Sequence, residues 1–119
     1  MNLHGITLPA DLTWDDEWAW TPYATEADHA TDGTQIIERS QPRQAGRPVT
    51  LAGAVNRAWV GRATLQALHA TLDQDEMTLT LWDGRELTVG WRHEDTPIEA
   101  TEIRPGSGWW YCTLRLRTV

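Results

Sequence analysis

The residues of this 119-residue chain that could do chemistry are two short runs of acids and histidine, one cysteine and a cluster of indoles. The run His93-Glu94-Asp95 places a base beside two carboxylates, but consecutive side chains in a loop diverge, whereas acid–base or metal chemistry needs them to converge. Glu26, Asp28 and His29 would hold a hard cation only if Asp28 and His29 turned to one side. We interpret both runs as solvated polar segments and predict no metal site.

The cysteine and the missing catalytic motifs argue against an enzyme. Cys112 is the single cysteine, so it cannot form an internal disulfide, and its place on the apolar side of WYCTLRL is typical of an inert core thiol. The chain contains no GxSxG, GxxxxGKS/T, HExxH or GxGxxG motif. We therefore predict a protein without enzymatic activity and without a cofactor.

Three indoles, at Trp14, Trp18 and Trp20, lie among carboxylates near the N-terminus. An indole face stacks on a sugar ring and carboxylates accept sugar hydroxyls, so a carbohydrate-binding platform is one interpretation. The other is that the indoles close the open end of a sheet or form a subunit interface, where tryptophan is enriched. The predicted interface consists of Trp14, Asp15, Asp16, Glu17, Trp18, Trp20, Glu26, Asp28, Asp32 and Gly33.

Charge is distributed unevenly along the chain. Residues 1–38 contain eight acids and no base, whereas residues 39–119 contain nine acids and ten arginines. The acidic third is either a solvated face or a surface that meets an arginine-rich patch, on a second copy or on another protein. The net charge of −7 and the pI near 4.9 argue against nucleic acid as a partner. No apolar run approaches the roughly 20 residues of a membrane span, so no membrane partner is expected.

One hairpin and one helix are the clearest elements around these residues. Asp32-Gly33 is a strong hairpin signal, and its polar flanking strands predict a ribbon at 24–41 that projects from the body. Leucines at positions i, i+3 and i+7 predict an amphipathic helix at 62–73, with Gly61 at its N-cap. The segment 11–22 fits neither period and is expected to be a loop pinned by its indoles.

Period-two alternation in the second half of the chain predicts a β-hairpin with one apolar face. A three-residue loop at 82–84 pairs Leu79 with Leu87 and so keeps apolar residues opposite one another. A two-residue Asp-Gly loop would set apolar residues against polar ones. We therefore predict the three-residue loop, with Gly84 in the left-handed conformation of a bulge.

The remaining strands complete a mostly β fold with one α-helix. Further strands are predicted at 3–8, 47–53, 98–103 and 109–118. The predicted core consists of Leu65, Leu68, Leu72, Met77, Leu79, Leu81, Leu87, Val89, Trp91, Trp110, Cys112, Leu114 and Leu116. About seven strands and one helix indicate a single domain over residues 1–119, either a two-sheet β-sandwich or a partly open barrel flanked by the helix.

Several short segments carry a resemblance to a known family: GRPVTL before the helix, DGRELTV in the hairpin and YCTLRL at the end. With their order, the chain resembles small tail proteins of long-tailed phages and prophages, in particular the N-terminal domain of distal tail proteins. The resemblance covers most of residues 1–119. It implies a tail-tube-like fold of two packed sheets and a flanking helix, which forms rings around a channel. Typical distal tail proteins also have a C-terminal carbohydrate-binding-like domain, which this sequence lacks.

The resemblance implies a structural subunit of a phage or prophage tail, a distal-tail or tube-associated minor tail protein, that acts by ring assembly. The expected partners are other tail proteins and further copies of the chain, with a monomer or weak oligomer in isolation. The expected location is the virion tail, and the host cytoplasm during assembly. A small carbohydrate- or receptor-binding β-sandwich module is the alternative that the residues leave open.

Overall fold

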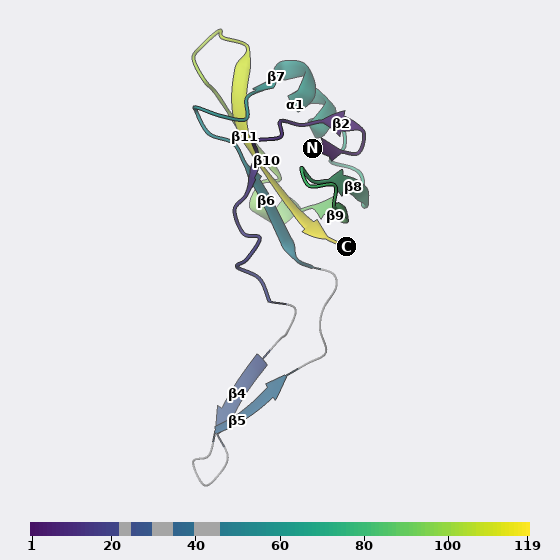
Figure 1. Cartoon of the computed structure of the whole chain (residues 1–119), viewed down its shortest axis with the longest axis vertical. Helices are drawn as coiled ribbons and strands as arrows, with labels where there is room; N and C mark the ends of the chain where they lie inside the picture. Colours follow the sequence, from purple (N-terminus) through teal and green to yellow (C-terminus); the bar gives the residue numbers. More distant parts are fainter. Residues whose placement is uncertain (22–24, 30–34, 40–45) are drawn as a thin grey trace.

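The computed structural model describes residues 1–21, 25–29, 35–39 and 46–119, with side chains for 1–21 and 46–119. Strands and one α-helix make up the fold (Figure 1). In chain order the elements are β1 (Asn2–Leu3), β2 (Ile6–Thr7), β3 (Thr13–Trp14), β4 (Thr25–His29), β5 (Gln35–Arg39), β6 (Pro48–Ala52), β7 (Val60–Gly61), α1 (Arg62–His69), β8 (Met77–Thr80), β9 (Glu86–Trp91), the 3-10 helix η1 (His93–Asp95), β10 (Ile98–Glu102) and β11 (Trp109–Thr118).

Strand β11, ten residues long, is the centre of the main sheet. One of its edges pairs with β7 and then β6, and the other pairs with β10 and then β9, all antiparallel. The sheet continues from β6 to β3 on one side and from β9 through β8 and β1 to β2 on the other. Two wings of the sheet are therefore joined through this one strand.

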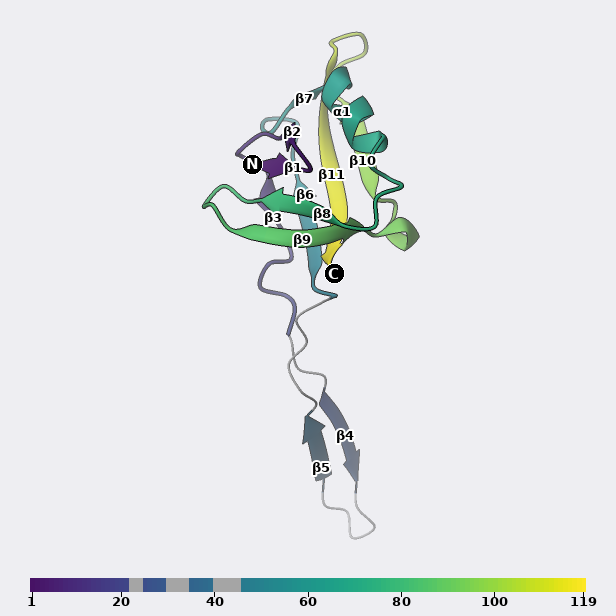
Figure 2. The ribbon, with the colours of Figure 1, turned by 90° about the vertical axis from the view of Figure 1, so that its right-hand side faces the viewer.

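The two wings curve around a common core. Figure 2 shows β8 and β9 running across the direction of β11, so the sheet bends strongly between them. Helix α1 lies over the end of the sheet between β7 and β2. One cluster of buried side chains fills the space, with Leu3 from β1, Leu51 from β6 and Leu68 from α1 all fully buried.

The fold class agrees with the sequence prediction of a mostly β protein with one helix. The nine strands form one antiparallel sheet that does not close, which corresponds to the partly open barrel rather than to two separate sheets. The reason is the length of β11. Each edge of β11 pairs with two strands in succession, so both wings stay hydrogen-bonded to the same strand.

The residues predicted for the core differ in how deeply they lie. Those that are buried are Leu68, Met77, Leu79, Leu81, Val89, Trp91, Cys112, Leu114 and Leu116. Leu65, Leu72, Leu87 and Trp110 are partly buried and pack against this cluster. The N-terminal residues Leu3, Leu8 and Leu12 also belong to it, although their short segments show no periodicity that would predict this.

The β8–β9 hairpin has the predicted register. Leu79 pairs with Leu87, and the Leu81 N–H donates to the Arg85 carbonyl at 2.8 Å. Gly84 has a φ angle of +89°, the left-handed conformation of a bulge after a three-residue loop. The choice of loop from the apolar pairing is therefore confirmed.

The N-terminal segment 3–8, predicted to be one strand, is a tight hairpin instead. Leu3 of β1 lies opposite Ile6 of β2, which leaves a two-residue turn at His4-Gly5. The φ angles of His4 and Gly5 are 51° and 83°, and two successive positive values are typical of a type I′ turn. The prediction was wrong because it treated Gly5 as an interior strand residue instead of a turn residue.

Helix α1 begins after Gly61, as predicted, but ends at His69 and not at residue 73. The N–H groups of Thr71 and Leu72 bond to carbonyls three residues earlier, which is the tighter 3-10 pattern. The Thr71 hydroxyl also donates to the Leu68 carbonyl at 2.7 Å. This side-chain bond competes with the α-helical pattern and accounts for the early end.

Strands β4 and β5 form a separate two-stranded sheet within the predicted ribbon at 24–41. Their register places Ala27 opposite Ile37. The predicted turn residues Asp32 and Gly33 lie outside the described part of the chain.

The register of β8 yields a direct test of which face is buried. We expect Leu79→Ala to lower the free energy of unfolding by about 2–5 kcal/mol, because it opens a cavity in the core. Thr80→Ala, on the opposite face of the same strand, should cost well under that. Urea unfolding followed by tryptophan fluorescence measures both values. Equal losses would mean that both faces of β8 are buried.

Gly90 in β9 is required by a close approach of another segment. A Cβ atom at this position would lie 2.8 Å from the Asp75 carbonyl oxygen, inside contact distance. We expect Gly90→Ala to lower the midpoint of urea unfolding and to cost about 1–3 kcal/mol. The matched control is Gly61→Ala, since a Cβ atom there meets nothing within 4 Å. A similar loss in both variants would contradict the steric explanation.

Candidate interaction surface

Residues 10–21, which carry the acids and indoles near the N-terminus, lie along the edge of β6. β3 pairs Trp14 with Leu51, and the Asp15 N–H donates to the Thr50 carbonyl at 3.0 Å. The segment predicted to be a loop at 11–22 therefore contains a short edge strand. The main-chain pairing fixes its position on the sheet.

Asp16 secures the turn that follows β3. Its carboxylate accepts the backbone N–H of Thr50 at 2.9 Å and the hydroxyl of Thr50 at 2.7 Å. Arg92, which follows β9, donates to the same hydroxyl. Hydrogen bonds to an ionised carboxylate are stronger than neutral ones, so this turn is held firmly against β6.

Arg47 packs against two of the three indoles. Its guanidinium carbon lies 4.6 Å from the ring centroid of Trp14 and 5.7 Å from that of Trp20, and it donates to the Glu17 carbonyl. The Trp14 side chain is only 7% exposed, and its N–H donates to the Pro48 carbonyl at 3.3 Å. Trp14 is therefore part of the core and cannot present its ring to a partner.

Trp18 lies in the same segment but has the opposite environment. Its side chain is 88% exposed, the highest value among the large hydrophobic residues that the structure describes. The neighbouring backbone is ordered by turns, in which the Ala19 N–H donates to the Asp16 carbonyl at 3.2 Å. The Trp18 ring is thus exposed to solvent, while the backbone around it is held by the hydrogen bonds of Asp16 to Thr50 and Ala19.

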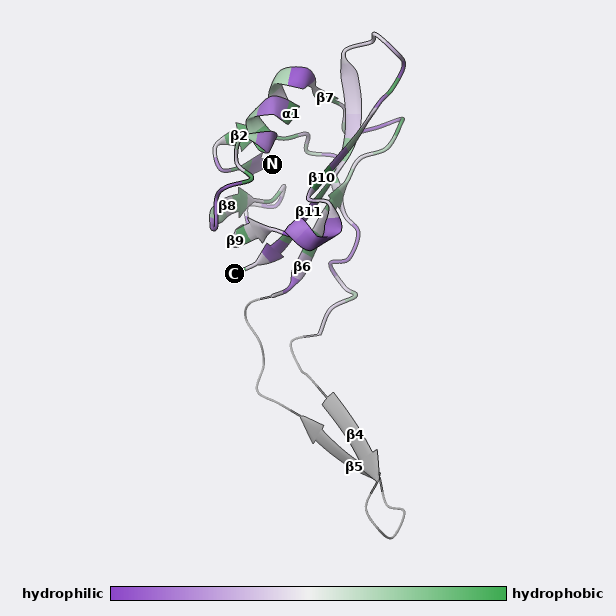
Figure 3. Ribbon diagram, turned by 180° about the vertical axis from the view of Figure 1, so that it is seen from behind, coloured by the Kyte–Doolittle hydropathy of each residue, from purple (hydrophilic) through white to green (hydrophobic). Residues whose placement is uncertain are grey.

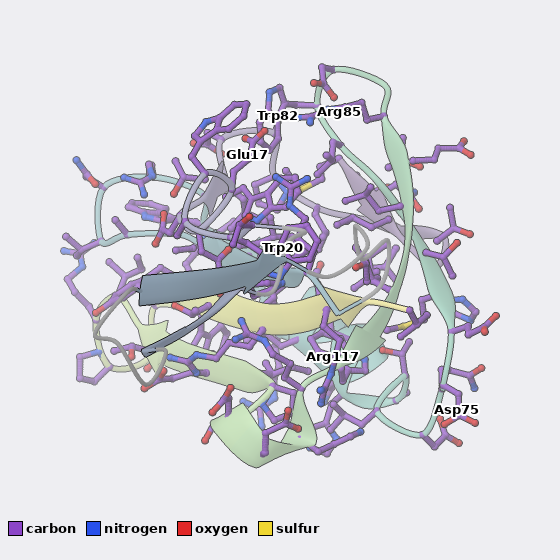
Figure 4. All side chains as sticks on the ribbon, turned by 90° about the horizontal axis from the view of Figure 1, so that it is seen from below. Glu17, Trp20, Asp75, Trp82, Arg85 and Arg117 are labelled. Carbon is purple, nitrogen blue, oxygen red and sulfur yellow. The ribbon has the colours of Figure 1, made fainter. Side chains whose placement is uncertain are left out.

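A cavity of about 380 Å³ lies between this segment and the β8–β9 turn. Its lining consists of Ala10, Asp11, Leu12, Thr13, Trp14, Glu17 and Trp82. Figure 4 shows Glu17, Trp82 and Arg85 together at one side of the molecule. Arg85 pairs with Glu17 at 3.2 Å and with Asp83 at 2.7 Å, and its guanidinium carbon lies 5.8 Å from the Trp14 ring centroid.

This surface keeps an excess of negative charge. Its carboxylates are those of Asp11, Asp15, Asp16, Glu17 and Asp83, and the arginines bound to it are Arg47, Arg57 and Arg85. Among the described side chains, the acids of this surface therefore outnumber the arginines bound to it, even when Arg92 at the Thr50 hydroxyl is included. The arginines of the body therefore neutralise much, but not all, of the acidic segment.

Trp82 is a surface residue that the sequence analysis did not include in the interface. It is 45% exposed and begins the loop of the β8–β9 hairpin. Trp59 and Trp109, which are 45% and 49% exposed, lie next to the paired residues Val60 and Trp110 of β7 and β11. The sequence could have indicated that Trp82 is exposed, because the predicted loop at 82–84 places it at the tip of a hairpin.

The polar run His93-Glu94-Asp95, considered for metal or acid–base chemistry, does not converge on one site. Figure 3 shows η1, which contains His93–Asp95, as a hydrophilic turn. Glu94 pairs with Arg117, and Asp95 pairs with Arg92 at 3.5 Å. In the described residues no group of three or more His, Cys, Asp or Glu side chains could bind a metal ion. The side chains of Glu26, Asp28 and His29 lie outside the described part.

Cys112 lies in the core with 1% of its surface exposed. Burial raises the pKa of its thiol to about 11. At neutral pH it is protonated, and the thiol is a far weaker nucleophile than the thiolate. Its environment is that of the inert core thiol expected from the sequence.

Comparisons of the chain with protein-family models, curated proteins and solved structures return no match. Within the described ranges, no helix has the length and apolar character needed to cross a membrane.

The role of Asp16 in fixing the segment can be measured. Asp16→Ala removes both bonds to Thr50, and we expect it to lower the free energy of unfolding by about 1–3 kcal/mol. Asp15→Ala is the matched control, since within the described ranges the Asp15 carboxylate accepts one hydrogen bond, from the exposed Thr13 hydroxyl at 2.8 Å. We expect this control to stay within about 0.5 kcal/mol of the wild type in urea unfolding. Equal effects would show that general negative charge matters and not the Thr50 contact.

Proposed function

We propose that the chain is a structural subunit of a phage or prophage tail, a distal-tail or tube-associated minor tail protein that acts by ring assembly and protein–protein contacts. The observation that carries the proposal is Trp18, 88% exposed on a segment otherwise tied to the sheet. The resemblance of the segment order to distal tail proteins supports the kind of assembly to which this contact would belong.

A fixed and exposed indole favours a binding role on energetic grounds. Burial of tryptophan removes a large apolar area from water, and tryptophan is enriched among the residues that dominate interface affinity. The bonds of Asp16 and Arg47 already order the surrounding backbone. Because little chain entropy remains to be lost, a partner that covers Trp18 gains most of the burial energy.

A carbohydrate-binding platform is the alternative function, and the surface supports it less well. Such a platform needs neighbouring aromatic faces open on the same side. Trp14 is 7% exposed, and the guanidinium of Arg47 lies 5.7 Å from the Trp20 ring centroid. Among the three indoles of this segment, Trp18 alone is then left as a freely exposed ring, which favours contact with a protein.

Complementation of a phage that lacks the gene for this chain tests the proposal. We expect the deletion to produce particles with defective tails under the electron microscope, and the wild-type chain to restore infectious particles. Trp18→Ala should lower the yield of infectious particles by about tenfold or more, because it removes the main apolar anchor.

Trp59→Ala is the control, since it removes a different exposed indole from the same body, and it should restore particles as the wild type does. Normal, infectious particles in the deletion strain would contradict the tail function. In that case the sugar alternative is tested by titrating the purified chain with glycans and recording tryptophan fluorescence. A saturable change that Trp18→Ala abolishes would support it.

A further inference from the structure

We propose that the cavity beside Trp82 binds the side chain of Arg104 from a second copy of the chain, so that copies associate head to tail. The inference rests on the proposed function, because it names one contact by which such subunits would assemble. Two independent observations lead to it: a cavity suited to a guanidinium group, and an arginine with no partner among the side chains of residues 1–21 and 46–119.

The lining of the cavity has the chemistry that recognises a guanidinium group. Trp82 supplies an exposed indole face, and Asp11 and Glu17 supply carboxylates, of which that of Glu17 already pairs with Arg85. Guanidinium groups bind over aromatic faces and form charge-assisted bonds with carboxylates. The excess of acids over arginines among the described side chains of this surface adds an attraction for a cation that comes from outside.

The chain contains an internal example of this recognition. The Arg85 guanidinium lies 5.8 Å from the Trp14 ring centroid and bonds to the Glu17 carboxylate at 3.2 Å. The lining residues Trp82 and Asp11 have no such guanidinium group bound to them among the described side chains. Among the described residues, the Asp11 carboxylate accepts one hydrogen bond, from the backbone N–H of Ala58 at 3.0 Å, which leaves it acceptor capacity.

Arg104 is the arginine that lacks a partner among those whose side chains the structure describes. The others bond to, pair with or pack on groups of the same chain; they are Arg47, Arg57, Arg62, Arg85, Arg92, Arg115 and Arg117. Arg104 is exposed in the turn between β10 and β11. Because the chain contains arginine and no lysine, a second copy would offer guanidinium groups as its strong cations.

The turn presents Arg104 in a defined geometry. The Ser107 N–H donates to the Arg104 carbonyl at 3.0 Å, and the Gly106 N–H donates to the Glu102 carboxylate at 2.9 Å. Figure 2 shows the turn after β10 at the top of the body and the β8–β9 turn at its left side. The two sites are apart within one chain, so the contact joins different copies and is heterologous, as in rings or filaments.

Two complementary variants test this contact by sedimentation velocity at high protein concentration. Arg104→Ala removes the arginine and keeps the cavity, whereas Trp82→Ala opens the cavity and keeps the arginine. We expect each variant alone to associate about tenfold or more weakly than the wild type. Their equimolar mixture should form a heterodimer, because the cavity of the first can still bind Arg104 of the second.

Two matched variants control for unspecific effects. Trp59→Ala removes an indole with the same 45% exposure as Trp82, and Arg62→Ala removes an arginine that packs on Trp110 of its own chain. Both should associate as the wild type does, and the association should weaken as salt is raised. Circular dichroism verifies that all four variants are folded.

Three outcomes would overturn the inference. They are a wild-type chain that stays monomeric at every concentration, an Arg104→Ala variant that associates like the wild type, or a mixture of the two complementary variants that forms no heterodimer. The phage complementation experiment is independent of all three. A tail defect in the deletion strain together with a normal Arg104→Ala would refute this contact and leave the tail function standing.

Discussion

The pairing of β11 on both of its edges is the constraint on which the rest of the structure depends. Each wing of the main sheet reaches the other only through this strand. Its inward residues Cys112, Leu114 and Leu116 form the middle of the core. The cavity has one wall from the segment beside β6 and another from the β8–β9 turn. The first wall is joined to β11 through β6 and the second through β9, so the position of the cavity depends on how the two wings pair with β11.

The sequence predicts well the features that depend on local alternation. In β8, β9 and β11, side chains alternate between core and surface, and a shift by one residue would reverse every side chain. The apolar pairing of Leu79 with Leu87 therefore decided the loop length as well as the strands. The start of α1 after Gly61 was also predictable, because the helical spacing of Leu65, Leu68 and Leu72 begins within the next turn.

The features that escaped prediction depend on contacts between distant parts of the chain or on very short elements. β3 has two residues, too few for any periodicity, and exists because it pairs with β6. The bonds from Asp16 to Thr50 cross 34 residues of sequence. Trp82 could be placed at a hairpin tip, but its position across a cavity from Glu17 depends on the bend of the whole sheet. The interface predicted from composition alone consequently included the buried Trp14 and omitted Trp82.

The described part of the acidic N-terminal segment, residues 1–21, lies beside arginines of the body. The sequence has eight acids and no base in residues 1–38, which indicates a strongly charged appendage. In the folded chain, Arg47 and Arg85 lie over this segment and bond to both the carbonyl and the carboxylate of Glu17. The carboxylate of Glu17 is therefore neutralised locally by Arg85, and Asp11 lines the cavity beside Trp82. In the proposed contact, one guanidinium group meets the Trp82 ring and the carboxylates beside it, so that local fit contributes more to the choice of partner than overall charge does.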